Sequence, residues 1–234
     1  MPKSTVANTS IEYAADLYNV KEVTLHGTAD LSFWEAVLRE EGLFPYHEAD
    51  KAILLLSAID TKWRGFKFRE FVIAVGVCLD ENGASLDGYY LPYAFNSSRL
   101  LAFSERVFFR TPYFQGDIRL ENKLPASIKL QDRREVLLDA RMSIPSTPPV
   151  VEYLEWEGPI FLPNKRGKFF AVLAGEADIY PFSSETDRFE IKPSARHGIF
   201  KQLIDSNFIG SVWSLRSKSR HAKSKTYRRD SDNG

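Results

Sequence analysis

Short apolar runs separated by turn residues dominate this chain. Residues 52–57, 66–77 and 88–95 are rich in β-branched and aromatic side chains and are bounded by Gly, Asn and Asp, which is typical of β-strands. Further runs of this kind lie at residues 117–120, 127–130, 136–144, 151–156, 158–162, 168–173 and 176–182. Strands this numerous favour a largely antiparallel sheet that curls or closes to protect its edges. The sequence therefore predicts a mostly β fold.

Few helices are expected between these strands. Residues 32–41 have one apolar face and stop at Gly42. A second, short helix can begin at Ser98 and cannot continue through Pro112. The apolar spacing within residues 194–205 predicts a third.

Composition predicts one folded domain with loose ends. The chain has 234 residues, of which 44% are hydrophobic and 26% charged, enough for one sizeable core. We expect a flexible N-terminus at residues 1–10 and a single domain at residues 11–213. Residues 214–234 carry few large apolar side chains, which predicts a basic disordered tail.

Charge is divided unevenly along the chain. Net charge is zero, but residues 214–234 contain seven Lys and Arg against two Asp, so the remainder is about five units acidic. This balance argues against nucleic acid as a partner, apart from weak contacts through the basic tail.

Other features narrow the cell biology and the chemistry. Cys78 is the only cysteine, so no internal disulfide can form. No apolar run is long enough to span a membrane and residues 1–9 lack the core of a secretion signal, which predicts a cytoplasmic protein.

His26, His47 and His197 lack metal-ligand spacing, and no phosphate or dinucleotide motif occurs. We expect neither metal nor cofactor, whereas homo-oligomerisation stays open.

Four motifs follow one another in a characteristic order. They are Phe68-Arg69-Glu70, Gly88-Tyr-Tyr-Leu-Pro92, Arg106 and Pro112-Tyr113-Phe114. This series resembles the acetoacetate decarboxylase family, over about residues 28–185. The resemblance implies a cone-like, closed or semi-closed antiparallel β-barrel with a few short helices and an enclosed interior pocket.

The resemblance also implies a missing reactive group. Family members carry a lysine pair after the proline, and the first lysine forms a Schiff base with the substrate's keto group. Tyr113 and Phe114 stand at these positions. The chain looks closest to a lineage of the same superfamily that lacks the Schiff-base lysine.

Glu70 and Tyr113 are the first candidate catalytic residues. Glu70 shares its strand face with apolar side chains, where a carboxylate is costly unless paired. It is either a proton shuttle with a raised pKa or one half of a salt bridge to Arg106 or Arg64. Tyr113 can donate a hydrogen bond to a carbonyl or enolate oxygen, or act as a general acid; the alternative is a buried tyrosine with a backbone partner.

Arg106 is the third candidate, because a guanidinium facing the pocket could hold a substrate carboxylate. The alternative is an ion pair with Glu70 that only supports the fold. The substrate-binding residues expected around these three are Arg64, Tyr93, Phe95 and Phe114.

Three functions fit this pattern. The first is a lyase or isomerase that acts on a small keto- or hydroxy-acid-type metabolite by non-covalent acid–base chemistry through Glu70, Arg106 and Tyr113. The second is a non-catalytic small-molecule binding protein that kept the barrel. The third is an interaction module whose basic tail contacts an acidic partner.

Overall fold

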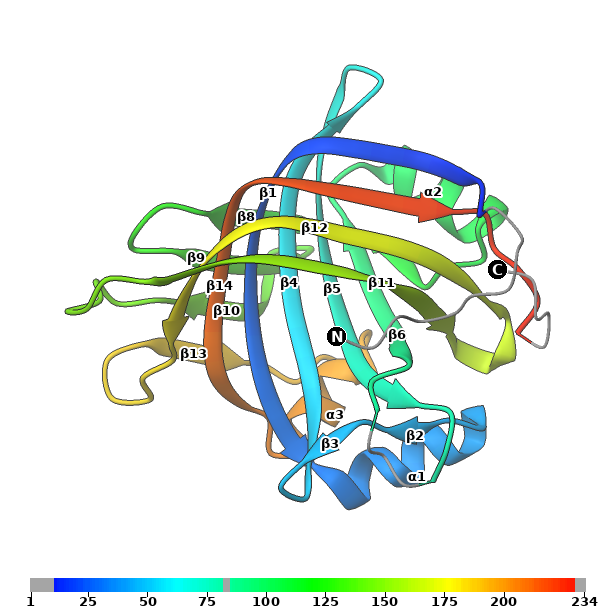
Figure 1. Cartoon of the computed structure of the whole chain (residues 1–234), viewed down its shortest axis with the longest axis horizontal. Coiled ribbons are helices and arrows are strands. Elements are labelled where there is room, and N and C mark those ends of the chain that lie inside the picture. The colour runs from blue at the N-terminus through cyan, green and yellow to red at the C-terminus, as the bar shows by residue number, and fades with distance from the viewer. Residues whose placement is uncertain (1–10, 82–84, 230–234) are drawn as a thin grey trace.

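Long, bent strands form most of the molecule (Figure 1). The computed structural model describes residues 11–81 and 85–229. Its strands are β1 (Tyr13–Asp30), β2 (Phe44–Pro45), β3 (His47–Glu48), β4 (Lys51–Trp63), β5 (Phe66–Cys78), β6 (Gly88–Asn96), β7 (Tyr113–Gln115), β8 (Asp117–Glu121), β9 (Ser127–Asp132), β10 (Glu135–Arg141), β11 (Val150–Leu162), β12 (Gly167–Pro181), β13 (Arg188–Ile191) and β14 (Ile209–Ser224). The helices are α1 (Leu31–Glu41), α2 (Arg99–Phe108) and α3 (Gly198–Asp205), with one 3₁₀ turn at Pro163–Lys165. The prediction of a mostly β fold with a few short helices is confirmed.

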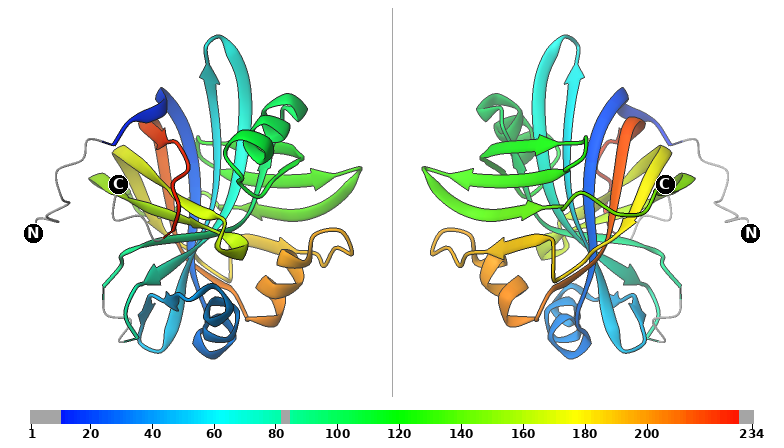
Figure 2. Two further views of the ribbon diagram at one scale, coloured as in Figure 1. Left: turned by 90° about the vertical axis from the view of Figure 1, so that its right-hand side faces the viewer. Right: turned by 90° about the vertical axis from the view of Figure 1, so that its left-hand side faces the viewer.

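Seven strands close into a ring. Their order is β5-β4-β1-β14-β12-β11-β6, and the pairing of β6 with β5 completes the circle. Most neighbours are antiparallel, as the prediction of a largely antiparallel sheet requires, but β11 with β6 and β6 with β7 are parallel pairs, so the sheet is mixed. A second sheet, in the order β13-β10-β9-β8, lies with α3 on one side of the ring (Figure 2).

The two faces of the ring strands have different environments. On β5, Phe71, Ile73 and Val75 are fully buried in the main core, which also contains Trp34 of α1 and Phe200 of α3. The alternate side chains of β5 point to the inside of the ring, because successive residues of a strand face opposite ways. Packing outside the ring therefore fixes which side chains face its interior.

Two helices end or begin at the residues that the sequence indicated. α1 ends at Gly42, whose φ of 67° is the left-handed conformation that glycine adopts readily. α2 begins as expected at Ser98, whose side chain accepts a hydrogen bond from the Leu101 amide. None of the helices within the described residues is long and apolar enough to cross a membrane.

The expected disordered tail is wrong for residues 214–224. These residues belong to β14, which lies inside the ring order and pairs with β1 and β12. Five ion pairs connect cations near the C-terminus with acidic side chains elsewhere: Arg216 with Glu22, Arg220 with Asp16, Lys223 with Glu105, Lys225 with Glu12 and Arg229 with Glu41.

These ion pairs explain why the prediction failed. A segment that looked too polar to fold finds its opposite charges within the same molecule, so its basic surplus is compensated by the acidic remainder of the chain. The expected boundary after residue 213 falls in the middle of a strand. Residues 1–10 and 230–234, expected to be flexible or disordered, lie outside the described residues.

Candidate active site

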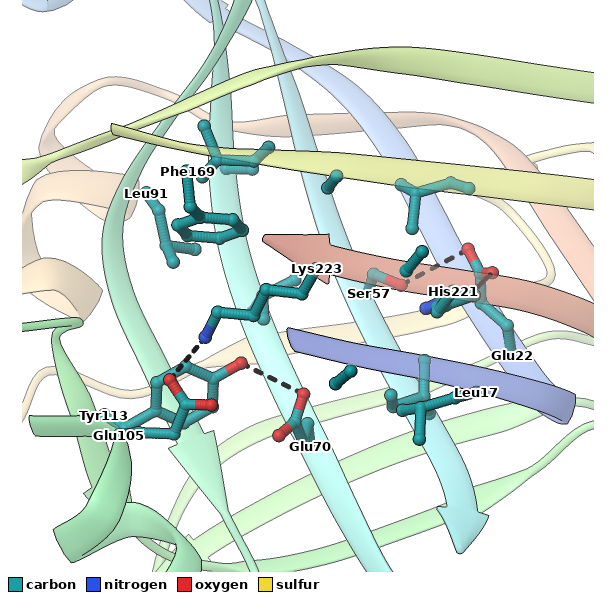
Figure 3. Close-up of a pocket in the computed structure, with 18 of the residues that line it drawn as sticks. Leu17, Glu22, Ser57, Glu70, Leu91, Glu105, Tyr113, Phe169, His221 and Lys223 are labelled. Atoms are coloured by element: carbon teal, nitrogen blue, oxygen red, sulfur yellow. Dashed lines mark hydrogen bonds and ion pairs between the residues drawn. The ribbon is translucent and has the colours of Figure 1, made fainter. Parts of the chain in front are cut away.

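A cavity of about 630 Å³ occupies the interior of the ring, and Figure 3 shows 18 of its lining residues. Apolar side chains make up most of its wall, including Leu17, Leu55, Ile59, Val72, Leu91 and Phe169. Phe108 also lines the cavity, although it is 73% exposed. The cavity therefore reaches the surface at the end of α2. It is more open than the enclosed pocket that the family resemblance implies.

Glu70 is a carboxyl group set into the apolar wall of the cavity. It lies on β5 between Phe68 and Val72, which also face the cavity. The amide of Asn96 donates a hydrogen bond of 2.9 Å to Oε1, and the hydroxyl of Tyr113 donates one of 3.0 Å to Oε2. Burial, followed by the charge of Glu105, raises the pKa of Glu70 to about 7. Glu70 can therefore give or take a proton near neutral pH.

Tyr113 faces the cavity from β7, beside Glu70. Only 5% of its surface is exposed. Burial, together with the nearby charges of Glu70 and Glu105, raises its pKa well above 10. The phenol consequently stays protonated and acts as a hydrogen-bond donor, the role in which Figure 3 shows it toward Glu70.

Lys223 brings a cation to the same place from β14, and the sequence did not predict it as a site residue. Its ammonium group forms an ion pair with Glu105 of α2 (Figure 3). It lies 4.7 Å from the ring centre of Phe169, 4.8 Å from Phe109 and 5.5 Å from Tyr113. Only one of its three N–H donors is used by the described residues, so two can serve a ligand.

Glu105 is fixed in place independently of the lysine. Its carboxylate accepts a hydrogen bond of 2.7 Å from the hydroxyl of Thr111, which is itself 1% exposed. Together, Glu70, Tyr113, Glu105 and Lys223 combine a carboxyl group that titrates near neutrality, a neutral phenol and an ion pair. Such a set can move a proton and stabilise negative charge on an oxygen atom.

Two predicted cationic site residues lie elsewhere. Arg106 is exposed on α2 and does not line the cavity. It follows Glu105 by one residue, which turns it about 100° around the helix, away from the inward face. Arg64 is exposed in the turn between β4 and β5, where its guanidinium lies 4.9 Å from the ring centre of Trp63. Neither arginine pairs with Glu70 among the described residues.

The three predicted aromatic binding residues face the other side of the sheet. Phe95 belongs to the main core and lies 5.0 Å from His197, whereas Tyr93 and Phe114 stack on each other at 4.8 Å and pack against this core. A bulge in β6 is the reason: Tyr93 pairs with Ile73 and Tyr90 with Val75, so β6 has one residue more than β5 between these pairs. The extra residue reverses which side chains face the cavity.

Solved structures similar to this chain include acetoacetate decarboxylases and acetoacetate decarboxylase-like enzymes. The acetoacetate decarboxylase of Legionella pneumophila has a TM-score of 0.63 at 13% identity, over 97% of this chain and 92% of that chain. An acetoacetate decarboxylase-like enzyme from Sphingomonas wittichii has a TM-score of 0.57 at 11% identity, over 97% and 100% of the two chains.

A third similar structure is the enduracididine biosynthesis enzyme MppR, complexed with the condensation product of pyruvate and imidazole 4-carboxaldehyde. Its TM-score is 0.54 at 12% identity, over 93% of this chain and 90% of that chain. No family model matches the sequence, and no curated protein matches it. The chain thus has the acetoacetate decarboxylase-like fold, as the four sequence motifs predicted.

Proposed function

We propose that the protein is a lyase or isomerase that acts on a small keto- or hydroxy-acid-type metabolite by non-covalent acid–base chemistry. The observation that carries this proposal is the hydrogen bond between Glu70 and Tyr113 beside the ion pair of Lys223 and Glu105. Both pairs face one largely apolar cavity, in which charges and hydrogen bonds act more strongly than in water.

Glu70 is the general base in this proposal. Its ionised carboxylate takes a proton from the carbon next to the substrate's carbonyl group. The C–H electrons form a C=C bond, and the carbonyl π electrons move to oxygen to give an enolate. A base is most effective when its pKa lies near the working pH, a condition that a pKa of about 7 meets.

The enolate oxygen needs hydrogen-bond donors. Lys223 supplies one directly, and Tyr113 can supply its single O–H once Glu70 has taken the proton and no longer needs this donor. The ammonium of Lys223 has two donors that no described residue uses, and the phenol of Tyr113 stays protonated. Delivery of the proton from Glu70 to a different carbon, or to the opposite face of the same carbon, completes an isomerisation. Departure of a leaving group from the neighbouring carbon, with the proton of Glu70 passing to that group, completes an elimination. The lysine acts here as a cation and forms no bond with the substrate.

Two further points support this proposal. MppR, which shares the fold, is described in complex with pyruvate, a small keto acid. In the motif order, Tyr113 and Phe114 take the positions of the family's lysine pair, which removes the usual amine nucleophile. We therefore infer that this chain belongs to a lineage that keeps the pocket and dispenses with the covalent intermediate.

Deuterium exchange into keto acids tests the proposal. Pyruvate, 2-oxobutyrate and acetoacetate are incubated with the protein in D₂O, and loss of the α-proton signal is followed by NMR. The parent should accelerate exchange for at least one of them, and Glu70→Gln should reduce the rate about 10²- to 10⁴-fold. If the parent accelerates none, or if Glu70→Gln exchanges as fast as the parent, the proposal fails.

Binding without turnover is the second candidate. The ion pair between Lys223 and Glu105 favours it, because a cation that already has a partner polarises a substrate less. In that case pyruvate or 2-oxobutyrate would bind the cavity, with Lys223 as the anchor, yet exchange no protons. Calorimetric binding in the absence of exchange distinguishes this function from catalysis.

A further inference from the structure

A second polar cluster lines the same cavity, in addition to the set formed by Glu70, Tyr113, Glu105 and Lys223. Glu22, Thr24 and His26 face the cavity at alternate positions of β1. Arg216 and His221 of β14 and Ser57 of β4 complete the cluster. Figure 3 shows Glu22, Ser57 and His221 grouped together at the right, away from Tyr113 and Glu105 at the left. We call these six residues the far polar cluster.

In the far polar cluster, several side chains form hydrogen bonds to the buried carboxylate of Glu22. Nη1 of Arg216 donates hydrogen bonds of 3.0 and 2.9 Å to the two oxygens of Glu22, and Nε2 of His221 lies 2.9 Å from Glu22 Oε2. Thr24 donates to Glu22 at 2.8 Å and contacts Ser57 at 2.7 Å. Glu22 is 4% exposed and Arg216 8%, so the pair is held away from solvent.

Some N–H donors of this cluster have no acceptor among the described residues. Nη2 and Nε of Arg216 donate to no described residue, and Nε is completely buried. The imidazole of His26 likewise makes no hydrogen bond with a described residue, although it lines the cavity. The buried Nε is out of reach of a ligand, so Nη2 of Arg216 and the ring of His26 are the groups available for an oxygen atom that enters the cavity.

The charge balance indicates the kind of oxygen. The charges of Glu22 and Arg216 compensate each other within one ion pair. Burial lowers the pKa of His26 to about 4, so its ring is neutral at physiological pH. A carboxylate placed here would lie next to the negative charge of Glu22, and Arg216 is already engaged by that charge. A hydroxyl or carbonyl oxygen would gain hydrogen bonds without this repulsion.

Cavity size and wall chemistry indicate the rest of the ligand. A volume of about 630 Å³ lies within the range of pockets that hold drug-sized molecules, and far exceeds the needs of a four-carbon keto acid. Leu55, Ile59 and Val72 belong to the largely apolar wall. A ligand that fills this space has an apolar body.

We propose that the cavity binds an elongated carbonyl compound with an apolar body, whose second, uncharged hydroxyl or carbonyl oxygen is held by Arg216 and His26. The reacting carbonyl lies at Glu70, Tyr113 and Lys223, an assignment that rests on the proposed function. Recognition of the second oxygen does not depend on turnover, so binding measurements test it separately.

Three matched ketones provide the test: a phenyl-substituted butanone, its para-hydroxyl derivative and its para-carboxyl derivative. Affinity is measured by titration calorimetry with the full chain. We expect the hydroxyl derivative to bind about tenfold more tightly than the unsubstituted ketone, the effect of one additional hydrogen bond. The carboxyl derivative should bind more weakly than the hydroxyl derivative.

Variants locate the preference. His26→Phe keeps the ring size but removes both nitrogens, so the hydroxyl preference should fall while affinity for the unsubstituted ketone stays the same. Arg216→Gln is combined with Glu22→Gln, because removal of the arginine alone would leave a buried unpaired carboxylate. If this double variant does not fold, His26→Phe alone decides. Glu70→Gln is the matched control and should keep the full hydroxyl preference.

Several results would overturn the proposal: binding of none of the ketones at millimolar concentration, equal affinities for the hydroxyl and unsubstituted ketones, tightest binding of the carboxyl derivative, or a preference that survives His26→Phe. The outcome is separable from the proposed function. A parent protein that discriminates among the ketones but exchanges no α-protons would retain the second oxygen site and reject the acid–base reaction.

Discussion

The hydroxyl of Tyr113 donates a hydrogen bond of 3.0 Å to the carboxyl group of Glu70, although 43 residues separate them in the sequence. The bond forms because β7 pairs with β6, which in turn pairs with β5. It ties a phenol that stays protonated to a carboxyl group that titrates near neutrality.

Glu70→Gln should change stability in a pH-dependent direction. The pKa of Glu70 is raised from 4.5 to about 7, so between these values the folded state binds more protons than the unfolded state. The free energy of unfolding of the parent therefore falls as pH rises through this window, whereas the amide of the variant cannot ionise. Denaturant unfolding should give similar stabilities at pH 4.5 and an advantage for the variant of up to about 3 kcal/mol at pH 8. A variant that is less stable at pH 8 would indicate a structural role for the charged carboxylate.

Tyr113→Phe should move the pH dependence of the exchange reaction. The hydrogen bond from Tyr113 favours the ionised form of Glu70, so its loss raises the pKa of Glu70 further. The rising limb of the pH–rate profile should therefore shift to higher pH, and the maximal rate should fall about tenfold or more because one oxyanion donor is lost. An unchanged profile would mean that the phenol is only a packing residue.

Lys223→Met should weaken the binding of keto acids about tenfold or more, because it removes the cation that faces the cavity. Lys225→Met is the matched control, since Lys225 lies two residues further along the chain and its ion pair with Glu12 is exposed. The second variant should bind as the parent does. Equal losses in both variants would point to a general charge effect.

Borohydride reduction with pyruvate or acetoacetate separates the two roles of Lys223. A lysine that acts only as a cation leaves the intact mass of the protein unchanged after reduction. A stable adduct mapped to Lys223 would show that its amine has taken over Schiff-base chemistry from a different strand, and would contradict the non-covalent mechanism.

Deletion of residues 218–234 should unfold the protein, because it removes the second half of β14 and its pairing with β1 and β12. Circular dichroism should show loss of the cooperative transition. Hydrogen exchange provides a non-destructive check: amides of residues 213–223 should be strongly protected in the full chain. Rapid exchange there, or an unchanged melting temperature after deletion, would support a disordered tail instead.

Several short strands and two long ones, β1 and β14, were not predicted, and the two long strands carry polar side chains on their inward faces. β1 and β14 pair with each other, and they line the cavity with Glu22, His26, His221 and Lys223. Their alternation is therefore not one of apolar inside and polar outside, which sequence patterns detect. A weaker signal was present in β14, where His221 and Lys223 alternate with the small residues Ala222 and Ser224.

The predicted site residues line the cavity where a regular strand carries them, and they lie elsewhere where local geometry intervenes. Glu70 lies on a regular strand, so its place in an apolar row correctly put it on the cavity wall. The predicted orientation of Arg106 was wrong because it lies one residue after the inward-facing Glu105 on the helix. The predicted orientation of Tyr93 and Phe95 was wrong because one extra residue in β6 reverses the faces of the strand. Neither the helix phase nor the bulge can be determined from composition or spacing alone.

The most direct test is the titration of Glu70 itself. Protein labelled with ¹³C at the glutamate carboxyl groups is titrated by NMR, and the signal of Glu70 is assigned by its loss in Glu70→Gln. We predict a midpoint near pH 7 that shifts when pyruvate is added, because burial in the ligand cavity raises the pKa of this group. A midpoint near 4.5 that does not respond to pyruvate would contradict an acid–base site at Glu70.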